Sequence, residues 1–217
     1  MRKYLMEFIG TFFLTLIICL TTGNYLAPIA IGSLLSAIIY MGYSISGAHF
    51  NPAVTLAVFI CKKISMKDSL FYIGSQFLGS FSAAYFYFSI WGRNIGNPHP
   101  SLDLNILKPF AIEIVFTFIL ALVVLFVAAS KNTQGNNYYG MAIGLTIIGI
   151  GTAGSTISGG GYNPAVASAT TLVDVLFGAC ECHPSKYVWI YFAGPFLGSA
   201  LAAFAFKVLS PEDFQEN

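Results

Sequence analysis

Two nine-residue stretches decide the fold of this chain: SGAHFNPAV at residues 46–54 and SGGGYNPAV at residues 158–166. Each contains Asn-Pro-Ala, and Asn is favoured immediately before a helix while Pro is favoured as its first residue. The apolar stretches that follow run from Pro52 to Ile60 and from Pro164 to Leu176. Both are shorter than the ~20 residues that a helix needs to cross a bilayer. We therefore expect two half-helices, which membrane depth tolerates only where protein or a water-filled cavity surrounds their free ends.

The composition places these stretches in a membrane protein. Of 217 residues, 56% are hydrophobic and only 9% are charged, whereas soluble domains carry about 25% charged residues. Ten Lys and Arg against nine Asp and Glu do not supply the basic surface of a nucleic-acid binder. An aromatic content of 16% is the opposite of a disordered composition. We predict one membrane domain over residues 1–217, surrounded by the lipid bilayer.

Six apolar runs are long enough to span, so the predicted fold class is an all-α integral membrane protein with six transmembrane helices and two re-entrant half-helices. Arg2 and Lys3 before the first run would also suit a signal peptide, but Glu7 interrupts that run and the second follows with almost no linker. The six predicted spans are about 4–22, 25–45, 69–91, 109–130, 138–156 and 187–208.

The Lys and Arg distribution predicts the orientation. With the N-terminus inside, seven of these residues face the cytoplasm and three face outward, as the positive-inside rule requires. Both termini are then cytoplasmic in a multi-pass protein of a cell membrane, plasma or inner. The inner set is Arg2, Lys3, Lys62, Lys63, Lys67, Lys131 and Lys207, and the outer set is Arg93, Lys108 and Lys186.

The chain contains an internal duplication. EFIGTF at 7–12 matches EIVFTF at 113–118, and YIGSQFLGS at 72–80 matches YFAGPFLGS at 191–199. We place repeat one at about 1–91, an outer connecting loop at about 92–108 and repeat two at about 109–217. Each repeat has three spans, an odd number, so the second enters the bilayer from the opposite side. Such inverted repeats place the working site near the midplane, where the two half-helices would meet with roughly +0.5 charge on each N-terminus.

With both motifs and the duplication in view, the sequence resembles the major intrinsic protein family, the aquaporins and aquaglyceroporins, over nearly its whole length. The resemblance implies six tilted helices and two half-helices around one narrow pore per subunit, four identical subunits, and a passive channel that is not an enzyme and needs no cofactor or metal. It implies that half-helix dipoles help to exclude cations. The pore motifs would be Asn51, Pro52 and Ala53 in repeat one, and Asn163, Pro164 and Ala165 in repeat two.

The resemblance also assigns roles around these motifs. Asn51 and Asn163 would donate hydrogen bonds to a solute, although they would also serve simply as helix caps. Backbone carbonyls would form an acceptor ladder along two segments. Glycine suits the second segment because we expect the chain to run extended there, with its carbonyls turned inward; a plain flexible loop is the alternative for that segment. The ladder residues would be Gly47, Ala48, His49 and Phe50 on one side, and Gly159, Gly160, Gly161 and Tyr162 on the other.

The predicted selectivity filter departs from the family pattern. Its four positions correspond here to Ile31, Gly151, Gly160 and Val166. Most members have Arg where this chain has Val166, and water-selective members have an aromatic residue and a His at the first two positions. The resemblance thus implies a wide, apolar, uncharged filter that admits water, glycerol, urea or undissociated metalloid acids such as arsenite. A strict water channel and a structural membrane protein of low permeability are the alternatives.

Two glutamates lie inside apolar spans, where an ionisable group needs a partner within the bundle. By position, Glu7 and Glu113 resemble the family's paired glutamates, which brace the half-helix loops through backbone amides. A proton-transfer pair is the other interpretation. A secondary transporter would normally have ion-coordinating acids at the midplane, where this chain has neutral Asn. His49 would either line the pore or bond the loop backbone.

The four cysteines do not form a disulfide framework. Cys19 and Cys61 suit small apolar fillers. Cys180, Cys182 and His183 carry soft ligands for a thiophilic metal, but their spacing matches no recognised zinc pattern. We therefore expect an exposed turn and no metal site.

Overall fold

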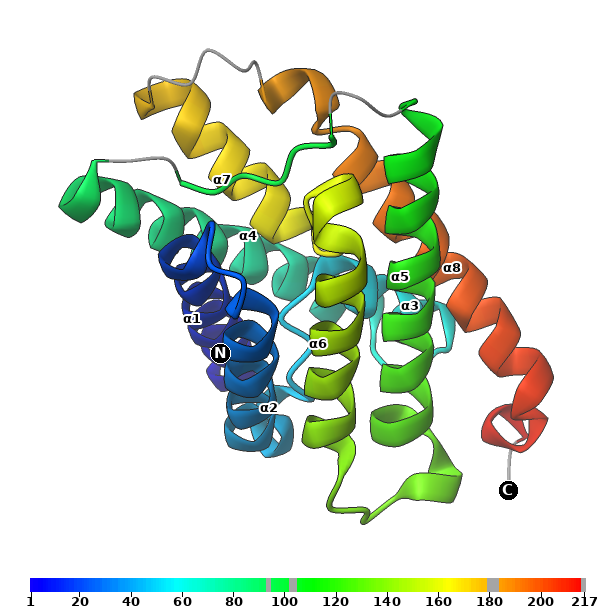
Figure 1. Cartoon of the computed structure of the whole chain (residues 1–217). Helices are drawn as coiled ribbons and strands as arrows, with labels where there is room; N and C mark the ends of the chain where they lie inside the picture. The colour runs from blue at the N-terminus through cyan, green and yellow to red at the C-terminus, as the bar shows by residue number, and fades with distance from the viewer. Residues whose placement is uncertain (93–94, 102–104, 179–183, 216–217) are drawn as a thin grey trace.

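The computed structural model describes residues 1–92, 95–101, 105–178 and 184–215, and within them the regular structure is entirely helical (Figure 1). Short π and 3-10 segments extend or join the α-helices. In chain order the elements are α1 (Arg2–Thr21), α2 (Ala27–Ser46), α3 (Pro52–Ile60), α4 (Met66–Trp91), α5 (Leu107–Val124), η1 (Leu125–Ala129), η2 (Lys131–Thr133), α6 (Tyr139–Ser158), α7 (Pro164–Phe177), η3 (Pro184–Tyr187), α8 (Ile190–Leu209) and η4 (Pro211–Phe214).

Five segments are both long and apolar enough to cross a membrane: α1, α2, α5 with η1, α6, and the stretch from Ser185 to Leu209 that contains α8. The sixth long helix, α4, has 26 residues and is about 39 Å long at 1.5 Å per residue. It is more polar than the other five, because its first turn contains Lys67 and Asp68 and its middle contains Gln76. The six-helix, two-half-helix class expected from the sequence is confirmed.

The long helices pack in close pairs because small residues occupy the crossings. On α4, Ser80 shares a hydrogen bond of 2.6 Å with Thr15 of α1, and a Cβ on Gly79 would collide with the α1 backbone at Phe8. Gly198 of α8 lies equally close to the α5 backbone at Ile114. The first and last helices of each repeat are thereby held together in the same way.

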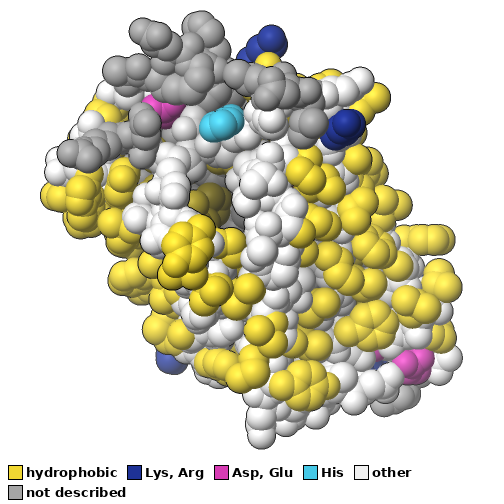
Figure 2. Space-filling model, viewed as in Figure 1, with side chains coloured by type: hydrophobic (Ala, Val, Ile, Leu, Met, Phe, Trp, Pro, Cys, Tyr) yellow, Lys and Arg dark blue, Asp and Glu magenta, His cyan; other side chains and the backbone are white. Residues whose placement is uncertain are grey.

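Both termini lie at one end of the bundle, which we call the inner end. Lys3 of α1 pairs with Asp68 (Nζ to Oδ2, 2.8 Å), and Lys63 pairs with Asp213 of η4 (Nζ to Oδ1, 2.6 Å). The opposite end, called the outer end, carries the segment 95–101, whose Ser101 N–H donates to Ile157 O at 3.2 Å. Figure 2 shows one side of the bundle. Apolar side chains cover much of this side, and charged side chains lie towards its two ends.

Candidate functional site

Each half-helix begins at an asparagine cap. Asn51 has an extended backbone (φ −156°, ψ 123°), and its Oδ1 accepts the Ala53 N–H at 2.9 Å. Asn163 has φ −146° and ψ 106°, and its Oδ1 accepts the Ala165 N–H at 3.1 Å. A proline then occupies the first helical position, where its missing N–H leaves no helical bond unmade. The cap fixes each side chain so that its amide nitrogen points away from its own helix.

The two amide nitrogens bond across to the opposite repeat. Asn51 Nδ2 donates to Tyr162 O, and Asn163 Nδ2 donates to Phe50 O, both at 2.9 Å. These reciprocal bonds hold the N-termini of α3 and α7 against each other. Because a side-chain amide has two N–H donors, one donor on each asparagine remains for another acceptor. The asparagines therefore act both as helix caps and as cross-links between the two repeats.

The segments before the two asparagines are not uniformly extended. In the first, Gly47, Ala48 and Phe50 have φ of 82°, 54° and 48°. In the second, Gly159 and Gly160 have φ of 84° and 73°, and Tyr162 has 40°. The extended conformation predicted for the second segment is thus wrong at Gly159, Gly160 and Tyr162. Non-glycine residues held in this region cost about 1–3 kcal/mol each, so other contacts must fix the two loops.

Those contacts come from the two glutamates. Glu7 accepts hydrogen bonds from the His49 and Phe50 N–H groups at 3.0 and 2.7 Å. Glu113 accepts from the Gly161 and Tyr162 N–H groups at the same two distances. Both side chains are fully buried. Each carboxylate lies against its own loop and orients the carbonyls of that loop.

A cavity of about 770 Å³ runs past the two asparagines and takes its walls from both repeats. All four predicted filter residues line it, together with most of the predicted ladder. Pro52, Ala53, Pro164 and Ala165 are buried beside it and are not part of its wall, and Gly47 instead ends α2 with its N–H on Tyr43 O. The predicted residues on the wall are Ile31, Ala48, His49, Phe50, Asn51, Gly151, Gly159, Gly160, Gly161, Tyr162, Asn163 and Val166.

The wall changes character along its length. Near the outer end it carries polar side chains from several elements: Thr21, Thr22, Asn24, Asn97, His99, Thr152, Ser155, Thr156 and Asp174. Toward the inner end it is apolar, with Leu35, Ile39, Val54, Leu120, Val124, Ile143 and Ile147. Sequence reasoning missed Asp174, whose Oδ2 accepts from Asn97 Nδ2 at 3.2 Å. An acidic residue inside an apolar half-helix was the available signal.

His49 both lines the cavity and forms a fixed contact. Its Nδ1 lies 3.1 Å from Thr55 Oγ1, one turn into α3, and its ring meets Tyr72 edge-on at 5.2 Å between centroids. The imidazole therefore bonds a helix side chain, and the loop backbone is left to Glu7. The sequence left two roles open for His49, lining the pore or bonding the loop backbone. In the structure His49 lines the cavity, and its ring bonds the Thr55 side chain, which neither interpretation predicted.

The comparison with protein families decides the identity. Residues 1–206 match the family model described as major intrinsic protein. The chain belongs to the major intrinsic protein family. It is 31% identical to Aquaporin-B of Dictyostelium discoideum, covering 96% of this chain and 83% of that protein. It is 32% identical to glycerol uptake facilitator protein-like 6 of Lactiplantibacillus plantarum, covering 98% and 100%.

The fold agrees with that membership. The structure of the aquaglyceroporin from Plasmodium falciparum superposes with a TM-score of 0.83 at 23% identity, covering 98% of both chains. This major intrinsic protein is a membrane channel for water and small solutes. Within the described residues no group of three or more His, Cys, Asp or Glu is placed to hold a metal ion. Cys180, Cys182 and His183 lie outside the described residues.

Proposed function

We propose that this channel conducts small neutral solutes as well as water, through a wide and uncharged filter. The observation that carries the proposal is the placement of Ile31, Gly151, Gly160 and Val166 on one cavity wall. Two of these positions have no side chain and none has a charge. Glycerol, urea and undissociated metalloid acids such as arsenite are the solute class that suits such a passage. The 32% identical relative named as a glycerol uptake facilitator supports the same class.

The path offers a solute both donors and acceptors. The second N–H of Asn51 and of Asn163 is a donor at the point where α3 and α7 meet, and loop carbonyls are acceptors on either side. Ile31 and Val166 form an apolar wall near the outer end. A molecule with hydroxyl or amide groups can exchange water for these groups one at a time, which lowers the cost of removing its hydration.

Cation exclusion then rests on the half-helices. An arginine about 6 Å from a passing cation would oppose it by roughly 3 kcal/mol at an effective dielectric constant of about 20, and Val166 supplies no such barrier. The N-termini of α3 and α7 each still present roughly half a positive charge. We therefore expect protons and metal cations to remain largely excluded, with a smaller margin. A proton flux comparable with the water flux would contradict this.

The test is stopped-flow light scattering on vesicles that contain the full chain, with water, glycerol and urea gradients. Val166→Arg restores both bulk and charge, and Val166→Gln is the matched control that adds similar bulk without charge. We expect Arg to lower glycerol and urea permeability about tenfold or more, because its side chain would narrow the passage and each ~1.4 kcal/mol added to the barrier lowers the rate tenfold, while water falls less. Wild-type vesicles that pass water but neither glycerol nor urea would refute the wide filter.

We further propose a homotetramer with both termini in the cytoplasm of a cell membrane, plasma or inner. The orientation follows from Arg2, Lys3, Lys63 and Lys131, which all lie towards the inner end and obey the positive-inside rule in that placement. Protease access to a C-terminal tag in sealed cells tests the orientation. Cross-linking in native membranes tests the subunit number. A cross-linked sample that contains only monomer would contradict the tetramer.

A further inference from the structure

Three helices contribute a stripe of cavity-lining residues at four-residue spacing, which is the spacing of one helical face. On α2 the stripe is Ile31, Leu35 and Ile39; on α5 it is Leu120 and Val124; on α6 it is Gly151, Ile147 and Ile143. Each is written from the outer towards the inner end. Among the described residues, the cavity wall reaches no further inward on these helices than Ile39, Val124 and Ile143.

The next position of each stripe lies where the cavity should open at the inner end. These positions are Tyr43 on α2, Ala128 on η1, which continues α5, and Tyr139 on α6. The Tyr43 and Tyr139 rings lie 4.3 Å apart between centroids. Tyr43 Oη donates to Ala128 O at 2.6 Å. The three stripes thus converge on one another one turn beyond the innermost residues of the cavity wall.

We propose that Tyr43 and Tyr139 form a gate at the inner mouth, shut in this structure and held shut through η1 by the C-terminal turn η4. The proposal rests on the proposed function only in taking the cavity as the solute path. Opening requires that the Tyr43 side chain leave one backbone carbonyl and one neighbouring ring. Both interactions are of a strength that thermal motion breaks and reforms.

The carbonyl that holds Tyr43 belongs to an irregular turn. Residues Leu125–Ala129 form a π-helix, a geometry that is rare and often found at functional sites. Its carbonyls are bonded by side chains from elsewhere: Phe126 O by Thr133 Oγ1 at 2.5 Å, and Val127 O by Asn136 Nδ2 at 2.7 Å. Tyr43 is the third such donor. The position of η1 is therefore set by side-chain contacts at the inner end, and these can change.

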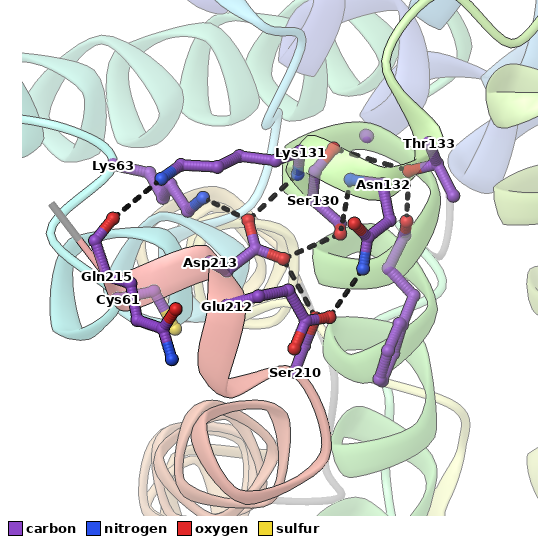
Figure 3. Close-up of polar contacts among 12 residues, drawn as sticks. Cys61, Lys63, Ser130, Lys131, Asn132, Thr133, Ser210, Glu212, Asp213 and Gln215 are labelled. Atoms are coloured by element: carbon purple, nitrogen blue, oxygen red, sulfur yellow. Dashed lines mark hydrogen bonds and ion pairs between the residues drawn. The ribbon is translucent and has the colours of Figure 1, made fainter. Parts of the chain in front are cut away.

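The C-terminal turn clamps the residues that follow η1 (Figure 3). Asp213 accepts from Ser130 Oγ at 2.7 Å and from the Lys131 N–H at 2.8 Å. It also accepts from Lys63 Nζ at 2.6 Å, and Lys63 lies three residues beyond the end of α3. One buried carboxylate thereby ties the end of α5 in repeat two to the end of the half-helix in repeat one. Releasing it frees η1, and with η1 the carbonyl that holds Tyr43.

The experiment measures water and glycerol permeability per channel in vesicles that contain the full chain. Tyr139→Ala removes one ring, and we expect both permeabilities to rise about tenfold, because the gate loses its ring contact and its bulk. Tyr43→Phe removes only the tether to Ala128, and we expect a rise of about threefold. The glycerol-to-water ratio stays at the wild-type value in both, because the filter residues near the outer end are untouched.

Tyr40→Phe is the matched control. Tyr40 lies three residues from Tyr43 on α2, is 41% exposed and is not on the stripe. Its ring lies 5.1 Å from that of Tyr139, and phenylalanine keeps this ring. The substitution removes only the hydroxyl, which donates to Asn137 O at 3.0 Å and accepts the Met141 N–H at 3.1 Å. We expect wild-type permeability. Unchanged permeability in Tyr139→Ala overturns the gate, and a changed glycerol-to-water ratio overturns it too, because it would place Tyr139 in the filter. A protein that passes water but no glycerol refutes the wide filter only, and the gate is then judged on water alone.

The role of the C-terminal turn is tested by Asp213→Asn, with Glu212→Gln as its neighbour control. We expect Asp213→Asn to raise both permeabilities as Tyr43→Phe does. We expect Glu212→Gln to leave them unchanged, because glutamine keeps an acceptor oxygen for Asn132 and Ser210 and Glu212 makes no bond to Lys63. Size-exclusion chromatography of each detergent-solubilised variant verifies folding. Wild-type permeability in a folded Asp213→Asn channel overturns the latch.

Discussion

The two loops that meet at the centre of the channel have the same shape and are held by different numbers of contacts. Glu7 in repeat one accepts four hydrogen bonds, from Ser46, His49, Phe50 and Gln76. The equivalent Glu113 accepts three, from Ser158, Gly161 and Tyr162. The difference arises on the fourth helix of each set, where repeat one has a glutamine and repeat two has a proline at the matching place.

The extra contacts coincide with a less permissive sequence. The first loop contains Ala48 and Phe50 at positive φ, whereas the second has Gly159 and Gly160 and only one such non-glycine residue, Tyr162. Glycine adopts this backbone region readily, and other residues do so at a cost. Repeat one therefore holds a strained loop with more hydrogen bonds, and repeat two lowers the strain with glycine and needs fewer.

The largest expected effect comes from removing each carboxylate. Glu7→Ala and Glu113→Ala both leave two loop N–H groups buried without an acceptor, at about 1–3 kcal/mol each. In repeat one, Gln76 Oε1 is buried and has no partner among the described residues, so it can turn toward a freed donor. We expect Glu113→Ala to lower the free energy of unfolding by about 4 kcal/mol, and Glu7→Ala by less.

Chemical denaturation in detergent, followed by intrinsic fluorescence, measures both variants against wild type. Phe13→Ala, on the partly exposed flank of α1, controls for the loss of a side chain that contacts neither loop. If Glu7→Ala destabilises the protein as much as Glu113→Ala does, or more, then Gln76 does not compensate for the lost carboxylate in repeat one.

A smaller effect is expected where the two repeats differ in sequence. Gln76→Leu removes Nε2 donors to Glu7 Oε2 and Thr55 Oγ1, at 2.8 and 3.0 Å. We expect a loss of about 2 kcal/mol in the free energy of unfolding, since hydrogen bonds to charged groups contribute about 1.5–3 kcal/mol. Pro195→Leu is the matched change in repeat two, where no side-chain donor is lost. If the two substitutions lower the free energy of unfolding equally, then the side-chain hydrogen bonds of Gln76 contribute nothing beyond its burial and shape.

The sequence was sufficient for the fold because its signals repeat. Two Asn-Pro-Ala triplets in matching places predict half-helices beginning at Pro52 and Pro164, and those are the first residues of α3 and α7. The predicted spans differ from the observed helices by a few residues at most. Helix periodicity and caps are local properties of a chain, and the inverted arrangement followed from counting spans.

The details of the site were less accessible. Positive φ at Ala48 and Phe50 is imposed by Glu7, which lies about forty residues away, so no local pattern predicts it. The reciprocal bonds of the asparagines depend on how two repeats dock. The inner mouth was missed because Tyr43 and Tyr139 appear in sequence as ordinary aromatic residues near helix ends. Their role as a gate is apparent only from the cavity-lining stripes on α2 and α6, which the structure is needed to identify.

The smallest effect is expected from pH, at the carboxylate that joins the two repeats. Burial alone would raise the pKa of Asp213, but the Lys63 ammonium and the Ser130, Lys131 and Ser210 donors together hold that pKa below its ordinary value. A lowered pKa means that the carboxylate stabilises the fold above about pH 4, the usual unfolded value, and that this stabilisation disappears only as the pH falls through the lower folded value. The pKa of the neighbouring Glu212 is also lowered, because hydrogen bonds from its own backbone N–H and from Ser210 favour its carboxylate, so neither acid of η4 takes up a proton between pH 7 and pH 5. We therefore expect water permeability to stay constant over that range, while Asp213→Asn raises it at every pH. A wild-type channel that opens between pH 7 and pH 5 would mean that some group other than Asp213 joins the inner ends of the two repeats.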